Sequence, residues 1–212
     1  MVSEISVPIE EFVGILQKRL PDREGNYTFF EVGALDGRDM ELMLDAFPNA
    51  EGHVFEGLLE NHEAYLKDNS RFKSYNVAIS NETGYQKFFV KNTNGIHGLR
   101  NRGDRYGMSS RSVFCMTLDD FCEKHGVGTI DAIKVDTEGC TYEVLIGAKR
   151  MLPNIGIMHI ETETSELFEG QVLEADVFEL LIKSGFKCVL KRSCLIVGSA
   201  YQTDSVWFNG DV

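Results

Sequence analysis

The sequence lacks an apolar run long enough to span a membrane, a secretion signal and any close pair of cysteines. Its five cysteines are odd in number and none belongs to a C-x-x-C pair, which argues against a disulfide framework and a zinc site. The N-terminus carries Glu4, Glu10 and Glu11 where a signal peptide has basic and apolar residues. We therefore expect reduced thiols and a soluble, cytoplasmic protein.

Positive charge is also scarce. The sequence has 21 Lys and Arg against 33 Asp and Glu, which gives a formal net charge of -12. The one short basic run is RNRGDR at 100–105. Because an acidic protein repels polyanions, we expect no nucleic-acid partner and no binding to an anionic membrane. The oligomeric state stays open.

The sequence shows no sign of a domain boundary. Its 212 residues, 43% of them hydrophobic, are enough for one full core. We find no internal repeat, low-complexity tract or Pro/Ser linker. We predict a single domain over 1–212, in which 1–27 form an N-terminal helix and its lead-in.

Hydrophobic periodicity predicts helices and strands in alternation. The first expected helix begins after Pro8. The others cover 39–47, 60–69, 118–125, 144–152 and 171–184. The expected strands cover 28–32, 52–56, 72–80, 130–136, 155–163, 186–192 and 205–209. This order predicts an α/β fold with a mostly parallel sheet, helices on both faces and an antiparallel strand pair at its edge.

A long glycine-rich stretch, 93–110, interrupts this alternation. It lies between two β-rich pieces, 84–91 and 110–118, that could pair with each other around it. Long stretches without regular structure inside a compact domain are usually functional or mobile. We interpret 93–110 as a candidate substrate lid.

Ligands of parallel sheets bind beyond the carboxyl ends of the strands. The first strand ends in EVGALDG, where Glu31 precedes Gly33 and Gly37; this is not the G-x-G-x-x-G of dinucleotide sites, and two glycines also suit a plain turn. Glu56 follows about twenty residues later, the spacing at which a carboxylate accepts ribose hydroxyls, although it could be an ordinary strand-terminal residue. Together they favour a nucleoside ligand without a phosphate at the turn.

The next strand ends carry more polar groups. Asn76 could bond an adenine edge and Ala78 leaves room for the ring, but both could be ordinary strand residues. Asp136 and Glu138 follow a buried strand, where Glu138 could instead cap the next helix. His159 and Glu161 share one face of the fifth strand, where His159 could be structural. Such groups can act as general bases or hold a hard ion such as Mg²⁺.

Taken in order, these strand ends resemble the FkbM-type S-adenosylmethionine-dependent methyltransferases. The similarity runs from Phe29 to Phe208 through FFEVGALDG, HVFEG, NVAIS, MTLDDF and above all IDAIKVDTEGCTYEVLIGAKRML. It implies a Rossmann-like, seven-stranded sheet with the last strand inserted antiparallel, and methyl transfer to an oxygen. At position 31 the family more often has Asp, and at position 35 Asn.

The resemblance also implies roles for individual residues. Around the methionine and sugar portions of S-adenosylmethionine it places Glu31, Gly33, Ala34, Asp36 and Gly37. Glu56 would bind the ribose hydroxyls, with Asn76, Val77 and Ala78 against the adenine. A metal-dependent enzyme would hold Mg²⁺ between Asp136 and Glu161.

For methyl transfer, the protein must align a hydroxyl with the sulfonium carbon and remove one proton. The candidate bases are Asp136, Glu138 and His159, with His97 a fourth if the glycine-rich stretch folds over the site. His97, Arg100, Arg102 and Arg105 are candidates for binding the acceptor, although the arginines could equally form a solvated loop.

Three alternatives compete with methyl transfer to a sugar or glycan. The resemblance points to a hydroxyl of a sugar or glycan, and the alternative is a hydroxyl of a polyketide or another small molecule. A dehydrogenase would need the phosphate-binding glycine motif that EVGALDG lacks. A catalytically silent binding module would have no need for the acidic residues and glycines at the strand ends.

Overall fold

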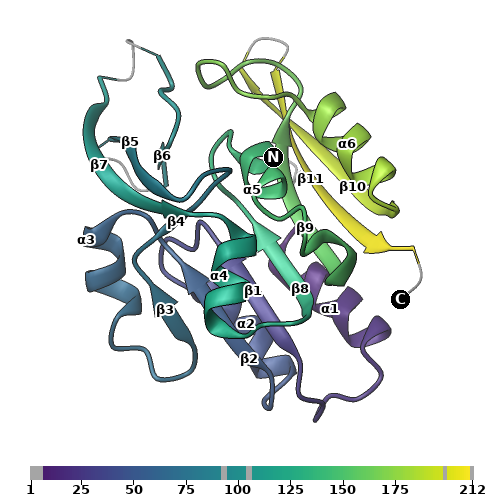
Figure 1. The fold of residues 1–212 in the computed structure, drawn as a ribbon. Helices are drawn as coiled ribbons and strands as arrows, with labels where there is room; N and C mark the ends of the chain where they lie inside the picture. The colour runs from purple at the N-terminus through teal and green to yellow at the C-terminus, as the bar shows by residue number, and fades with distance from the viewer. Residues whose placement is uncertain (1–6, 92–94, 104–106, 198–199, 211–212) are drawn as a thin grey trace, which may run out of the picture.

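The computed structural model describes residues 7–91, 95–103, 107–197 and 200–210. Its central sheet has the strand order β10-β11-β9-β8-β1-β2-β3 (Figure 1). The strands are β1 (Thr28–Val32), β2 (Glu51–Phe55), β3 (Lys73–Tyr75), β8 (Ile130–Val135), β9 (Ile155–Glu163), β10 (Phe186–Val197) and β11 (Ala200–Asn209). β11 runs antiparallel to β9 and β10, and the other neighbours are parallel. The predicted seven-stranded sheet with an antiparallel last strand is confirmed.

Helices cover both faces of this sheet. On one face lie α1 (Ile9–Arg19), α2 (Arg38–Ala46) and α3 (Leu59–Asn61) with its π-helical continuation η1 (His62–Leu66). Phe12, Met40 and Leu66 join these elements in one hydrophobic core. On the other face lie α4 (Leu118–His125), α5 (Thr141–Ile146) and α6 (Glu174–Lys183), which contribute Phe121 and Val177 to a second core. The sheet is therefore buried on both sides, as its apolar strands predict.

Local capping explains where two helices end. In α4, the Thr117 side chain accepts the Asp120 N–H and Gly126 ends the helix in a left-handed conformation, so both predicted ends are correct. α5 stops at Ile146, although the apolar period continued to Leu152. The N–H groups of Arg150 and Met151 donate to the Asp119 carboxylate, so this stretch forms turns and the 3-10 helix η3 (Leu152–Asn154) instead.

A smaller sheet of four strands stands beside the carboxyl ends of the central strands (Figure 1). It contains β4 (Ala78–Ile79), β5 (Gly84–Val90), β6 (His97–Gly98) and β7 (Ser109–Met116) in the order β4-β7-β5-β6. The expected pairing of 84–91 with 110–118 is confirmed, because β5 and β7 are antiparallel neighbours. The single strand expected over 72–80 was wrong: β3 joins the central sheet and β4 joins the small one.

No helix within the described ranges is long and apolar enough to cross a bilayer.

Candidate active site

A cavity of about 330 Å³ opens at the carboxyl end of the central sheet. The lining residues come from the ends of the central strands, from the small sheet and from the loops between them. They are Val32, Gly33, Leu35, Phe55, Glu56, Gly57, Val77, Ala78, Ile79, Phe88, Gly95, His97, Gly98, Leu99, Asp136, Thr137, Glu138, Cys140, Glu161 and Gln202. Both the position and the size are those of a small-molecule site in a parallel sheet.

The turn after β1 forms one wall of this cavity. Gly33 has a φ of 82°, and a Cβ atom there would lie 1.9 Å from the carbonyl oxygen of Asp136. Only glycine therefore lets the turns after β1 and β8 approach so closely. Leu35 also has a positive φ, 52°, and its N–H donates to Oε2 of Glu56 at 3.0 Å. The turn is thus held against the end of β2.

Glu56 lines the cavity although its residue is only 2% exposed. Its Oε1 accepts the N–H of Leu58 at 2.7 Å, and its Oε2 accepts that of Leu35. His97 covers it from the small sheet, with Nε2 3.3 Å from Oε1. Each carboxylate oxygen can accept more than one hydrogen bond, so both can still accept a hydroxyl. Val77 and Ala78 line the same part of the cavity.

Five residues expected to contact the cofactor do not line the cavity: Glu31, Ala34, Asp36, Gly37 and Asn76. Ala34 packs in the core under α2, and Gly37 precedes α2 in a left-handed conformation. Asp36 pairs with Arg38 at the surface. Asn76 donates to the carbonyls of Glu56 and Gly57. Their positions support a role in shaping the turns around the cavity and not the expected contact.

Glu31 differs most from its expected role. Its carboxylate accepts the N–H of Met40 in the first turn of α2 at 3.0 Å, below the cavity. Burial raises its pKa to about 8, an effect that Lys134 opposes and Asp39 reinforces. The sequence placed an acid at the strand end, but the alternation of β1 turns this side chain toward the core that contains Phe29.

This burial predicts a pH-dependent cost to stability. Between the ordinary Glu pKa and about pH 8, folded Glu31 holds a proton that the unfolded chain releases, so the free energy of unfolding falls as pH rises. We expect Glu31→Gln, which can still accept the Met40 N–H, to remove on the order of 2 to 4 kcal/mol of this loss. Chemical denaturation of both proteins at about pH 6 and about pH 9 measures it. Equal losses in both proteins would contradict the prediction.

Carboxyl groups that follow β8 or lie on β9 also line the cavity. Asp136, Glu138 and Glu161 all line it. Burial and the neighbouring Asp136 raise the pKa of Glu138 to about 8, and the same two causes raise the pKa of Glu161 well above its ordinary value. Glu138 is therefore largely protonated at neutral pH and can donate a hydrogen bond, and burial favours the protonated form of Glu161 as well. Oε1 of Glu161 is buried without a hydrogen-bond partner among the described residues.

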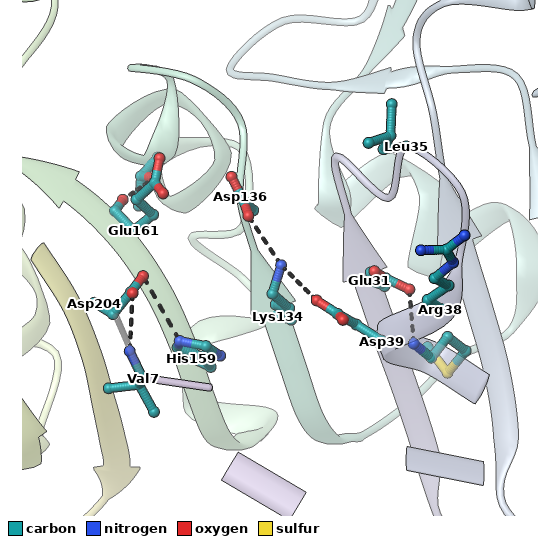
Figure 2. A network of polar contacts seen from close by, with 12 residues as sticks. Val7, Glu31, Leu35, Arg38, Asp39, Lys134, Asp136, His159, Glu161 and Asp204 are labelled. Carbon is teal, nitrogen blue, oxygen red and sulfur yellow. Dashed lines mark hydrogen bonds and ion pairs between the residues drawn. The ribbon is translucent and has the colours of Figure 1, made fainter. Parts of the chain in front are cut away.

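Sequence reasoning missed Lys134, which lies below these acids. Its Nζ is 2.9 Å from Oδ2 of Asp136 and 3.0 Å from Oδ2 of Asp39, as Figure 2 shows. The available signal was a lysine inside the mostly apolar strand IDAIKV, because a buried ammonium requires anionic partners.

The expectation that His159 acts as a base is not supported. His159 does not line the cavity; it is 3% exposed and lies under α1, with its ring centroid 5.1 Å from that of Phe12. Burial lowers its pKa to about 3, so the ring stays neutral. Its nearest charged group in Figure 2 is Asp204, which accepts the N–H of Val7. This arrangement suits a buried structural histidine.

The expected Mg²⁺ site finds no support. Asp136 and Glu161 both line the cavity, but the carboxylate of Asp136 pairs with Lys134. Across the described ranges, no three His, Cys, Asp or Glu side chains are arranged to hold a metal ion.

The candidate lid is described at 95–103 and 107–110, and Arg105 lies outside these ranges. His97 lines the cavity as expected. Arg100 instead binds the Glu143 carboxylate and the carbonyl of Glu169, 3.0 Å away. Arg102 lies near Glu138, at 3.8 Å, and over the ring of Phe168. The two arginines thus fasten this segment to the loop before α6, which was not predicted.

Sequence reasoning also missed several cavity residues. Thr137 lies between two predicted acids, and its hydroxyl is buried without a hydrogen-bond partner in the described structure. Gln202 enters from β11, which starts at Ala200, five residues before the predicted start at 205. No local pattern marks a glutamine in an edge-side strand as a site residue.

Comparison with known proteins places this site in a family. Residues 31–188 match the model of the Methyltransferase FkbM domain. The chain belongs to the FkbM methyltransferase family. The matched residues run from the end of β1 to the start of β10. They include every residue that lines the cavity except Gln202 of β11.

Individual proteins agree with this assignment. The chain is 27% identical over 189 residues to the 2-O-methyltransferase NoeI of Sinorhizobium fredii (strain NBRC 101917 / NGR234), covering 81% of this chain and 75% of NoeI. The N-terminal domain of EvdMO1 with SAH bound superposes with a TM-score of 0.53 at 13% identity, over 97% of this chain and 82% of that one. Magnesium protoporphyrin IX methyltransferase (ChlM) from Synechocystis PCC 6803 with bound SAM superposes with a TM-score of 0.52 at 10% identity, over 95% of this chain and 77% of that one. The last two show a shared fold.

Proposed function

We propose that this FkbM-family chain is an S-adenosylmethionine-dependent O-methyltransferase that acts on a hydroxyl of a sugar or glycan. One observation carries the proposal. Gly33, Glu56 and Asp136, each at the end of a different strand, line the same cavity at the carboxyl end of the sheet. The name of NoeI, a 2-O-methyltransferase, supports oxygen as the methyl acceptor.

The residues present fit the cofactor. The two oxygens of Glu56 are fixed by the N–H groups of Leu35 and Leu58 and keep capacity for the two ribose hydroxyls. Val77 and Ala78 offer an apolar surface for the adenine. The Asp136 carboxylate beyond Gly33 favours a cationic sulfonium nearby. When bound, S-adenosylmethionine supplies an electrophilic methyl group.

Asp136 is the residue we assign as base. Burial and Asp136 raise the pKa of Glu138 to about 8 and raise that of Glu161, which favours their protonated forms, so both suit donation of hydrogen bonds to the acceptor. Asp136 lines the same space, paired with Lys134, and its carboxylate can take the proton that the acceptor hydroxyl loses.

The acceptor end of the cavity suits a hydroxyl-bearing ligand. Glu138, Glu161 and Gln202 provide carboxyl and carboxamide groups, which bind hydroxyls as donors and as acceptors. The family resemblance points to saccharides among hydroxyl-bearing acceptors.

A methyl-transfer assay against a panel of sugars, glycans and polyketide alcohols, read by mass spectrometry, tests the proposal. We expect a product that carries one added methyl group on a sugar oxygen. Transfer only to polyketide hydroxyls would overturn the acceptor class, and transfer to nitrogen would overturn the reaction. Lack of S-adenosylmethionine binding in calorimetry would favour a silent binding module.

A further inference from the structure

Lys134 is a buried lysine next to the cavity that the proposed reaction does not yet use. Its side chain is 12% exposed and does not line the cavity. Its ammonium lies between two carboxylates, Asp136 at 2.9 Å and Asp39 at 3.0 Å (Figure 2). In the sheet it is also the register partner of Glu31 on β1 and of His159 on β9. Burying an ammonium is costly unless it is paired, so this placement is strongly specified.

The two partners of Lys134 belong to the two halves of the proposed site. Asp39 is in the first turn of α2, which begins directly after the Gly33 turn. Asp136 follows β8, lines the cavity and is the proposed base. Lys134 therefore ties the turn proposed for the cofactor to the proposed base by two short ionic contacts.

The ion pair also restricts how Asp136 can turn. The Asp136 side chain is 37% exposed, so packing alone leaves it room to rotate. Lys134 binds Oδ2, which leaves Oδ1 to accept a proton from a hydroxyl in the cavity. Charge-assisted contacts of this length fix geometry as well as supplying energy.

On the basis of the proposed function, we propose that Lys134 is a positioning residue that holds the Asp136 carboxylate in line with the methyl acceptor and sets its distance from the cofactor turn. Lys134 acts through Asp136 and does not touch the substrate. A misplacement of about 1 Å in a reacting group can cost about a hundredfold in rate, which is the size of effect at stake.

A double-mutant cycle tests this inference. We compare kcat and the calorimetric Kd for S-adenosylmethionine in the wild type, Lys134→Met, Asp136→Asn and the double variant, using the acceptor found in the panel. We expect Lys134→Met to lower kcat about tenfold to a hundredfold while the Kd changes less than about threefold. In the Asp136→Asn background the same change should lower kcat less than about twofold, because its target is already lost.

A merely structural lysine gives a different result. It would lower kcat by the same factor in both backgrounds, and that outcome overturns the inference, as does a Lys134→Met kcat within about twofold of wild type. Lys73→Met is the matched control, because Lys73 pairs with Glu51 in the same sheet, away from the cavity, and we expect its kcat to be unchanged.

If Lys134→Met does not fold, Lys134→Arg provides a second test. It keeps the charge but has a longer, forked group, so we expect the melting temperature and the Kd to be retained and kcat to fall about threefold to tenfold. An unchanged kcat in this variant overturns the inference. A wild-type protein that binds S-adenosylmethionine but methylates no acceptor would instead overturn the proposed function, and the inference with it.

Discussion

Replacement of Glu56 by alanine is expected to weaken S-adenosylmethionine binding by at least about a hundredfold. In the proposed complex the Glu56 carboxylate accepts two ribose hydroxyls, and each hydrogen bond to a charged group contributes about 1.5 to 3 kcal/mol. The substitution also leaves the N–H groups of Leu35 and Leu58 without their acceptor, which loosens the turn that lines the cavity. Calorimetry with S-adenosylmethionine measures the loss.

The matched control is Glu51→Ala, at the other end of the same strand. Glu51 is a half-exposed residue that pairs with Lys73 and His53 and does not line the cavity, so its loss should leave the affinity unchanged. Melting temperatures of both variants separate lost binding from lost folding. An affinity in Glu56→Ala within about threefold of wild type would remove Glu56 from the cofactor site.

The fold was largely predictable from local patterns. Apolar runs such as that of β9 are long and bounded by turns, and Thr117 and Gly126 mark both ends of α4. The failures have tertiary causes. α5 ends early because the distant Asp119 takes the N–H groups that would continue it. The strand expected over 72–80 divides because its second half pairs with β7 in another sheet.

The site was predictable to the level of strand ends and not to the level of side-chain direction. Gly33, Glu56 and Asp136 line the cavity, and each directly follows a strand; Glu138 lines it from the turn after β8. Glu31 is the last but one residue of β1, and the pleat turns it into the core. One position of difference along a strand therefore separates a cavity residue from a buried one.

Contacts between distant segments were beyond prediction from local patterns. Lys134 contacts Asp39 because β8 and β1 are neighbours and α2, which carries Asp39, packs against β1 and β2. Arg100 pairs with Glu143, which is 43 positions away in the sequence. The basic run was expected to bind an acceptor, but this arginine instead holds its own segment against α5. A sequence shows the charges, while the sheet order decides their partners.

Asp136→Asn is expected to lower kcat by about a hundredfold to ten-thousandfold, the range for loss of a general base. The amide has the same shape as the carboxylate and its oxygen can still accept from Lys134, so the cavity should keep its form. In the proposed site Asp136 faces the acceptor and makes none of the ribose contacts assigned to Glu56, so we expect the Kd for S-adenosylmethionine to change less than about threefold. Steady-state kinetics with a saturating acceptor, alongside calorimetry, measures both.

The control for this variant is Asp131→Asn on the same strand. Asp131 lies at the opposite end of β8, where its carboxylate accepts the Thr28 N–H at 2.7 Å, and an asparagine can accept the same hydrogen bond. We expect wild-type kcat from it. If Asp136→Asn also keeps full turnover, Asp136 is not the base, and Glu138, whose pKa is raised to about 8, is the next carboxyl group to test. In that case kcat should rise as pH increases toward about 8, because Glu138 gains its basic form only as it loses its proton.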